Sequence, residues 1–210
     1  MKNAPLLVGI SGASGVIYGV RLLAALKRID VPRHLVMSAS AEVTLALETD
    51  LKLADVHALA DRVYDVGDIA AAPSSGSARF RGMVIAPCSI RTMSEIATGV
   101  TASLLTRAAD VTLKERRRLV LMVRETPLHT GHLRTMTALS EMGAIISPPV
   151  PSFYAAPSSI EEMVDHTVGR ILDLFDIDSG QVHRWGSDGT RRRPSRKRGA
   201  GKSSGPAGDA

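Results

Sequence analysis

The chain has 210 residues, of which 44% are hydrophobic and 22% charged, which is the balance of an ordinary globular domain. This length suits one well-buried domain and is short for two. No apolar run approaches the roughly 20 residues needed to span a bilayer, and the single cysteine, Cys88, excludes an intrachain disulfide and a multi-cysteine zinc site. We interpret the short apolar stretch near Met1 as a first core strand rather than a signal peptide. These features favour a cytoplasmic protein.

The net charge of +5 resides in the C-terminal segment 187–210, which holds seven Lys/Arg and two Asp. Residues 1–186 carry equal numbers of basic and acidic side chains. The segment lacks periodicity and aliphatic side chains larger than alanine, so we expect a domain of residues 1–186 followed by a disordered basic tail. The tail has no aromatic residue for base stacking, which argues against specific nucleic-acid recognition. The basic charge of the tail leaves contact of the tail with an anionic surface as an alternative.

Short apolar runs alternate along the chain with longer stretches of helical periodicity. In chain order we predict strands at residues 6–10, 33–37, 83–86, 119–123 and 144–147. The predicted helices cover residues 16–29, 39–49, 89–98, 128–142 and 160–175. Strands that read as continuous Leu, Val and Ile are typical of a parallel sheet buried on both faces. The pattern therefore predicts an α/β, flavodoxin- or Rossmann-like three-layer sandwich with a mainly parallel, doubly wound sheet, whose ligands bind at the carboxyl ends of the strands.

The first predicted strand runs into a glycine-rich turn, GISGASG, and then a helix. Backbone amides of such a turn at a helix N-terminus suit a phosphate, although a tight turn without a ligand has the same pattern. The spacing is GxxGxxG rather than GxGxxG, and the second strand ends in Ser38 and Ser40 instead of an acidic residue. Because NAD binding usually needs such an acid for the ribose, the pattern disfavours NAD.

The third predicted strand ends in the hydroxyl-rich sequence PCSIRT, in which Ser89 and Thr92 have the spacing of a helix N-cap. The need to cap the helix explains one of these two hydroxyls. A polar ligand site beside the glycine-rich turn would use both. The loop 73–77 is expected to be flexible and able to close over a ligand. Cys88 is either a nucleophile or a packed thiol, and we favour the packed thiol.

Charged side chains gather near the later strands. Arg124 and Glu125 follow the fourth strand, where they form either a functional pair or an ion pair that caps the next helix. Arg107 and Lys114 lie seven residues apart on one helix, so they share a face and are either functional or solvated.

The remaining candidates are aromatic rings and histidines. Tyr154, in a proline-rich loop, either donates its hydroxyl to a phosphate or packs. Trp185 either docks the C-terminus or faces developing positive charge. His129 and His132 share a helix face, but metal ligation would need a third ligand that we do not find.

With these residues assembled, the chain resembles the UbiX/PAD-type flavin prenyltransferases over roughly residues 5–186. The resemblance rests on the blocks GISGASGVIYGVRLL, HLVMS, LETD, SSGS, MVIAPCSIRTMSEIATG, LLTRAADVTLKERRRLVL, VRETPLHTGHL, GAIISPPVPSFY and a final RW. Two features depart from the family pattern: Arg118 stands where the family often has proline, and the basic tail is extra.

The resemblance implies a fold that holds FMN at the strand ends, in a large homo-oligomer such as a dodecamer, with sites at subunit boundaries. The implied FMN-contacting positions are Gly12, Ala13, Ser14, Ser38, Ser89, Ile90, Arg91, Thr92 and Arg124. The implied prenyl-phosphate positions are Arg107, Lys114, Glu125, Tyr154 and Arg170, with Glu48 and Trp185 flanking the reacting groups.

The resemblance also implies the reaction: dimethylallyl monophosphate is joined to N5 and C6 of reduced FMN, independently of metal, to make the cofactor of a UbiD-type decarboxylase. The implied catalytic residues are Glu125, Glu48, Lys114 and Trp185, and the absence of a DDxxD-like cluster agrees with a metal-free clamp. The expected setting is ubiquinone biosynthesis, with the breakdown of aromatic acids as the alternative. The rival functions are a same-fold, FMN-dependent cysteine-type decarboxylase and a non-catalytic flavin carrier subunit.

Overall fold

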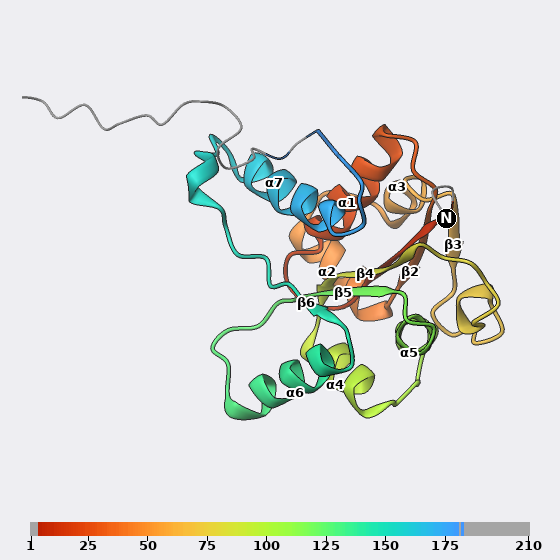
Figure 1. Ribbon diagram of the computed structural model, residues 1–210. Coiled ribbons are helices and arrows are strands. Elements are labelled where there is room, and N and C mark those ends of the chain that lie inside the picture. The colour runs from red at the N-terminus through yellow and green to blue at the C-terminus, as the bar shows by residue number, and fades with distance from the viewer. Residues whose placement is uncertain (1–3, 181, 183–210) are drawn as a thin grey trace, which may run out of the picture.

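The computed structural model describes residues 4–180 and 182. Six strands form one parallel sheet in the order β3-β2-β1-β4-β5-β6 (Figure 1). The strands are β1 (Leu6–Ile10), β2 (Arg33–Met37), β3 (Arg62–Tyr64), β4 (Gly82–Cys88), β5 (Arg118–Val123) and β6 (Ile145–Ile146). The chain winds outward from β1 to β3 and returns to begin β4 beside β1, so the switch point of the sheet lies between β1 and β4.

Helices cover both faces of this sheet (Figure 1). One face carries α1 (Ile17–Arg28), α2 (Ala39–Glu48), α3 (Leu53–His57) and α7 (Ile160–Asp173). The other carries α4 (Ile90–Thr98), α5 (Leu104–Lys114) and α6 (Thr130–Glu141). Two short 3₁₀ helices, η1 (Ala72–Ser74) and η2 (Phe153–Ala155), lie in the connections. The predicted three-layer, doubly wound α/β class is confirmed.

The core explains why the strands read as unbroken apolar runs. Alternate residues of β1 enter opposite cores, with Leu6 and Val8 on the α1/α7 side and Leu7 on the α4–α6 side. Both sets are at most 1% exposed, so each strand needs apolar side chains at every position.

The predicted element bounds differ from the observed ones mainly at the ends and edges. The strands at 6–10 and 33–37 have the predicted limits, whereas β6 spans two residues instead of four. The sequence pattern missed β3 and α3, because a three-residue strand at the sheet edge with an exposed first residue carries no periodic signal.

The tail 187–210 and Trp185 lie outside the described residues. Within residues 4–180 and 182, no helix has the length and apolar character to cross a bilayer.

Candidate functional site

A pocket of about 540 Å³ lies at the carboxyl ends of β1, β2, β4 and β5. It is lined by Gly12, Ala13, Ser38, Ala39, Ser40, Val66, Ser89, Ile90, Arg91, Thr92, Glu95, Ala102, Ser103, Leu105, Arg124 and Glu125. The position at the switch point and the volume are those expected of a ligand site in this fold class. A wider groove of about 1020 Å³ lies near Arg81 and Arg118, at the amino ends of β4 and β5, and none of the predicted flavin residues line it.

Most predicted flavin positions meet in this pocket. Gly12, Ala13, Ser38, Ser89, Ile90, Arg91, Thr92 and Arg124 all line it, and Glu125 lies beside them. Ser14 does not line the pocket and instead hydrogen-bonds the carboxylate of Glu48. The sequence analysis missed further lining residues: Val66 and Ser103, which lie in connections, and Glu95, which lies within α4 and pairs with Arg91.

Ser11, which the sequence analysis did not single out, joins the two strand ends at the switch point. Its hydroxyl donates to the Pro87 carbonyl at 2.9 Å and accepts from the Ser89 amide at 2.8 Å. The side chain is 1% exposed. These two bonds fix the first glycine turn against the start of α4 and so set the width of the pocket.

Gly12 permits a close approach between the β1 and β2 turns. A Cβ atom at this position would lie 2.3 Å from the Ser40 Cβ and 3.0 Å from its carbonyl carbon. A larger residue would have to push the two turns apart, so the glycine serves to keep the pocket closed on this side.

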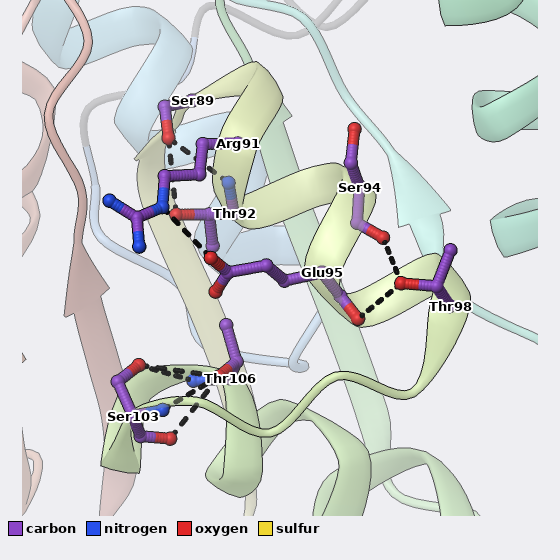
Figure 2. A network of polar contacts seen from close by, with 8 residues as sticks. All are labelled: Ser89, Arg91, Thr92, Ser94, Glu95, Thr98, Ser103 and Thr106. Atoms are coloured by element: carbon purple, nitrogen blue, oxygen red, sulfur yellow. Dashed lines mark hydrogen bonds and ion pairs between the residues drawn. The ribbon is translucent and has the colours of Figure 1, made fainter.

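Serine hydroxyls cap the helices that begin at the pocket. Ser38 accepts from the Ala41 amide at 3.2 Å, and Ser89 accepts from the Thr92 amide at 3.2 Å. Figure 2 shows that Ser89 also contacts the Thr92 hydroxyl, while Arg91 forms an ion pair with Glu95 at 2.8 Å. Capping therefore accounts for Ser89, and the exposed face of this helix start is polar.

Glu48, at the end of α2, caps α1. Its carboxylate accepts from the Gly15 amide at 2.8 Å and from the Val16 amide at 3.2 Å, and α1 has no cap from its own N-terminal side chain. Two of the turn amides expected to bind a phosphate are thus occupied by a carboxylate of the same chain. Burial raises the pKa of Glu48, but the hydrogen bonds from Ser14, Gly15 and Val16 and the charge of Arg124 outweigh it, so the pKa lies below its ordinary value.

Arg124 and Glu125 lie exposed at the pocket rim after β5. The Arg124 amide donates to the Cys88 carbonyl at 3.1 Å, and the Glu125 carboxylate accepts from the Thr126 amide at 2.9 Å. The ion pairs found among the described residues do not join Arg124 to Glu125. His129 caps α6 instead, through Nδ1, so the interpretation of the pair as a helix cap is wrong.

Cys88 packs in the core, and the two histidines at the start of α6 pack against each other. Burial raises the pKa of the Cys88 thiol, and the side chain is fully buried, as expected for a packed thiol. His129 and His132 stack with ring centroids 3.6 Å apart. Across residues 4–180 and 182, no three His, Cys, Asp or Glu side chains are grouped to hold a metal ion.

The predicted prenyl-phosphate residues other than Glu125 lie outside the pocket, in two separate places. Arg107 and Lys114 are on α5, where they pair with Asp110 and Glu115. Tyr154 is on η2 and is 52% exposed, and Arg170 is on α7, where it pairs with Asp173.

The loop 73–77, expected to close over a ligand, is held against α5. Arg107 donates to the Ser74 carbonyl at 3.3 Å. Arg117 donates to the Gly76 carbonyl at 2.7 Å and to the Ala78 carbonyl at 2.6 Å. In this conformation the two arginines satisfy carbonyls of the loop, and its closure over a ligand stays a prediction.

Comparison with known proteins places these residues in a family. The Flavoprotein family model matches residues 1–172. The chain is 61% identical over 173 residues to the flavin prenyltransferase UbiX of Escherichia coli strain K12, covering 82% of this chain and 92% of that protein.

Two solved structures are similar over most of their length. AnUbiX, solved in complex with FMN and dimethylallyl pyrophosphate, is 50% identical with a TM-score of 0.86, covering 87% of this chain and 97% of that chain. A dodecameric FMN-dependent UbiX-like decarboxylase from Escherichia coli O157:H7 is 47% identical with a TM-score of 0.84, covering 86% of this chain and 98% of that chain. At this identity over most of both chains, the protein belongs to the flavoprotein family and, within it, to the UbiX flavin prenyltransferases, as the sequence resemblance implies.

Proposed function

We propose that this chain is a flavin prenyltransferase that joins the dimethylallyl group of dimethylallyl monophosphate to reduced FMN. The observation that carries the proposal is the gathering of Gly12, Ser38, Ser89 and Arg124, with Glu125, around one pocket at the switch point. The proposed enzyme is cytoplasmic, uses residues 1–186 as one catalytic domain and carries 187–210 as an appended tail. Its product is the prenylated flavin of a UbiD-type decarboxylase, with ubiquinone biosynthesis as the setting.

The residues of the pocket fit FMN. Serine hydroxyls and the exposed start of α4 supply donors for a phosphate and ribityl chain, Gly12 leaves room at the turn, and Arg124 adds a positive charge at the rim. The reduced flavin would supply the nucleophilic N5 and C6 positions. Glu125 lines the same pocket and is the residue proposed to carry protons there.

The prenyl-phosphate site is proposed to form between copies of the chain. Lys114 and Arg107 lie on the α4–α6 side of the sheet, whereas Arg170 and Tyr154 belong to the α7 side. One copy cannot bring both sets to one phosphate, because its own sheet separates them. A homo-oligomer, such as the dodecamer of the Escherichia coli relative, would join Arg107 and Lys114 of one copy to Tyr154 and Arg170 of another beside a flavin pocket.

The proposed chemistry is departure of a clamped phosphate. Lys114, Arg170 and Tyr154 donate to the dianion, and loss of one such donor costs about 2.7–4 kcal/mol in comparable sites. Glu125 gives a proton to the departing phosphate and later takes the proton released by the flavin. Glu48 has a lowered pKa and acts as a carboxylate. Trp185, which lies outside the described residues, is assigned the role of stabilising the allylic cation.

The test is anaerobic incubation of the protein with FMN, dithionite and dimethylallyl monophosphate, followed by mass spectrometry of the extracted flavin. The expected product is heavier than FMN by one prenyl unit. The diphosphate is run in parallel, since AnUbiX was solved with dimethylallyl pyrophosphate. Bound but unmodified FMN with both donors would reject the proposal in favour of a decarboxylase or a flavin carrier.

A further inference from the structure

The loop 73–77 runs along the face of α5 that carries two proposed phosphate donors, Arg107 and Lys114. The Arg107 Nε donates to the Ser74 carbonyl at 3.3 Å. Two helical turns further on, the Lys114 side chain lies against Gly76, where an added Cβ atom would be 2.8 Å from the Lys114 Nζ. Both donors of this helix therefore contact the same short loop.

Gly76 leaves the space that the ion pair of Lys114 and Glu115 occupies. A Cβ atom at Gly76 would lie 2.2 Å from the Glu115 Oε1, closer than two such atoms can approach. The glycine does not have a left-handed backbone, so its importance here is the absence of a side chain. The backbone of Gly76 is thus one wall of the space in which the Lys114 ammonium lies.

Arg117 holds this part of the loop from the end of α5. Its Nη2 donates to the Gly76 carbonyl at 2.7 Å and its Nη1 to the Ala78 carbonyl at 2.6 Å. The Arg117 backbone amide donates to the Thr112 carbonyl at 2.9 Å, which ties the residue to the last turn of the helix that carries Lys114. One guanidinium therefore sets the spacing between the loop and α5.

Arg117 does not line the flavin pocket. It lines the groove at the amino ends of β4 and β5 instead. An effect of its geometry on a phosphate bound by Lys114 would therefore pass through residues 76–78. The planar fork of arginine fixes the direction of both carbonyls, whereas a lysine at this position would keep the charge and lose the fork.

We propose that Arg117 is a positioning residue of the prenyl-phosphate site, which holds residues 76–78 against α5 so that the Gly76 backbone directs the Lys114 ammonium to the phosphate. The inference rests on the proposed function, in which Lys114 is a phosphate donor. It assigns the role to the two-pronged guanidinium and not to its charge, so lysine should not replace it.

The test is calorimetric titration of the oligomeric protein, loaded with oxidised FMN, with dimethylallyl monophosphate. No turnover is needed. Arg117→Lys should weaken binding about tenfold, within the range that a misplaced contact group costs. Lys114→Ala should weaken binding as well, and adding Arg117→Lys to it should cause no further loss, because Arg117 acts through Lys114. A general loosening of the fold would instead cause the same loss in both backgrounds.

Arg118→Lys is the matched control. Arg118 lines the same groove, and its guanidinium lies 3.9 Å from the Asp176 carboxylate and over the Phe175 ring rather than on the loop. This variant should bind dimethylallyl monophosphate like the wild type. FMN affinity, measured for each variant, should stay within about twofold of the wild type, because the flavin pocket does not include either arginine.

Gly76→Ala tests the same wall with Arg117 in place. The added Cβ meets the far ends of flexible side chains, so the thermal unfolding temperature should change little while the Lys114 ammonium is displaced and phosphate binding weakens.

Three results would each overturn the inference alone: unchanged binding in Arg117→Lys or in Gly76→Ala, equal losses in Arg117→Lys and Arg118→Lys, or a further loss when Arg117→Lys is added to Lys114→Ala. A wild type that binds no dimethylallyl monophosphate, or a Lys114→Ala variant that binds it normally, would overturn the proposed function instead.

Discussion

The flavin pocket and the prenyl-phosphate residues are built in opposite ways. The pocket draws on the carboxyl ends of β1, β2, β4 and β5 within one chain. The phosphate residues lie on two faces of the sheet, and Arg107, Lys114 and Arg170 are each paired with an acidic neighbour of the same chain. The strand order of one chain is therefore sufficient to form the flavin pocket. The proposed second site would need another copy of the chain and a phosphate that replaces those carboxylates as the partner of the basic side chains.

The largest expected effect tests the division between copies. Lys114→Ala and Arg170→Ala should each lower turnover by about a hundredfold or more, because each removes a donor to the leaving phosphate. Oligomers refolded from a mixture of the two variants should recover activity at about a quarter of the sites, where both partners are intact. Prenylated flavin is measured by mass spectrometry. Absence of recovery in a mixed oligomer would place both residues in one copy.

The next effect tests whether one chain forms the flavin pocket. Gly12→Ala should weaken FMN binding by about 10- to 100-fold, because its Cβ would lie 2.3 Å from the Ser40 Cβ and overpacking costs about 1–3 kcal/mol. Flavin fluorescence titration measures the affinity. Gly12→Ala with Ser40→Gly should recover part of it, and a double variant no better than Gly12→Ala would show that another contact is responsible.

Two matched helix-cap substitutions, with a smaller expected effect, test whether FMN affinity depends on the pocket itself or on the stability of the whole fold. Ser89→Ala at the pocket and Ser159→Ala at the start of α7 each remove a hydroxyl that accepts a hydrogen bond from a backbone amide. Loss of such a helix cap costs about 1 kcal/mol of stability. Denaturant unfolding should show similar losses for both. FMN affinity should fall for Ser89→Ala alone, and an equal fall in both variants would mean that the pocket responds to global stability.

The smallest effect concerns Glu48. The folded-state pKa lies below the ordinary value of 4.5, so the ionised carboxylate stabilises the fold above that value and this contribution is lost as the pH falls through the folded-state pKa. Glu48→Gln keeps an acceptor for the Gly15 and Val16 amides without the charge. Because the side chain is exposed, we expect a difference of no more than about 1 kcal/mol at pH 7. Unfolding measured from pH 7 to pH 3 should show that the difference in unfolding free energy between the wild type and Glu48→Gln shrinks below about pH 4.5. A difference that grows as the pH falls would contradict a lowered pKa for Glu48.

Much of the fold and of the flavin pocket is predictable from local sequence. Continuous apolar runs indicate strands buried on both faces, as β1 and β2 confirm. Small and hydroxyl-bearing residues just after those strands, such as Gly12, Ser38 and Ser89, must share one edge of a parallel sheet. Both signals are short-range, so a single sequence carries them.

Only the tertiary structure decided which distant groups meet. Glu48 caps a helix start 33 residues before it, and Ser11 bonds the chain 76 residues after it. The arginines that hold the loop 73–77 and the ring of His166 beneath Tyr154 are equally invisible in sequence spacing. Such contacts depend on how helices pack across the sheet, which no local pattern records. The same packing puts the proposed phosphate residues on opposite faces of the sheet, so the proposed site would need a second copy of the chain.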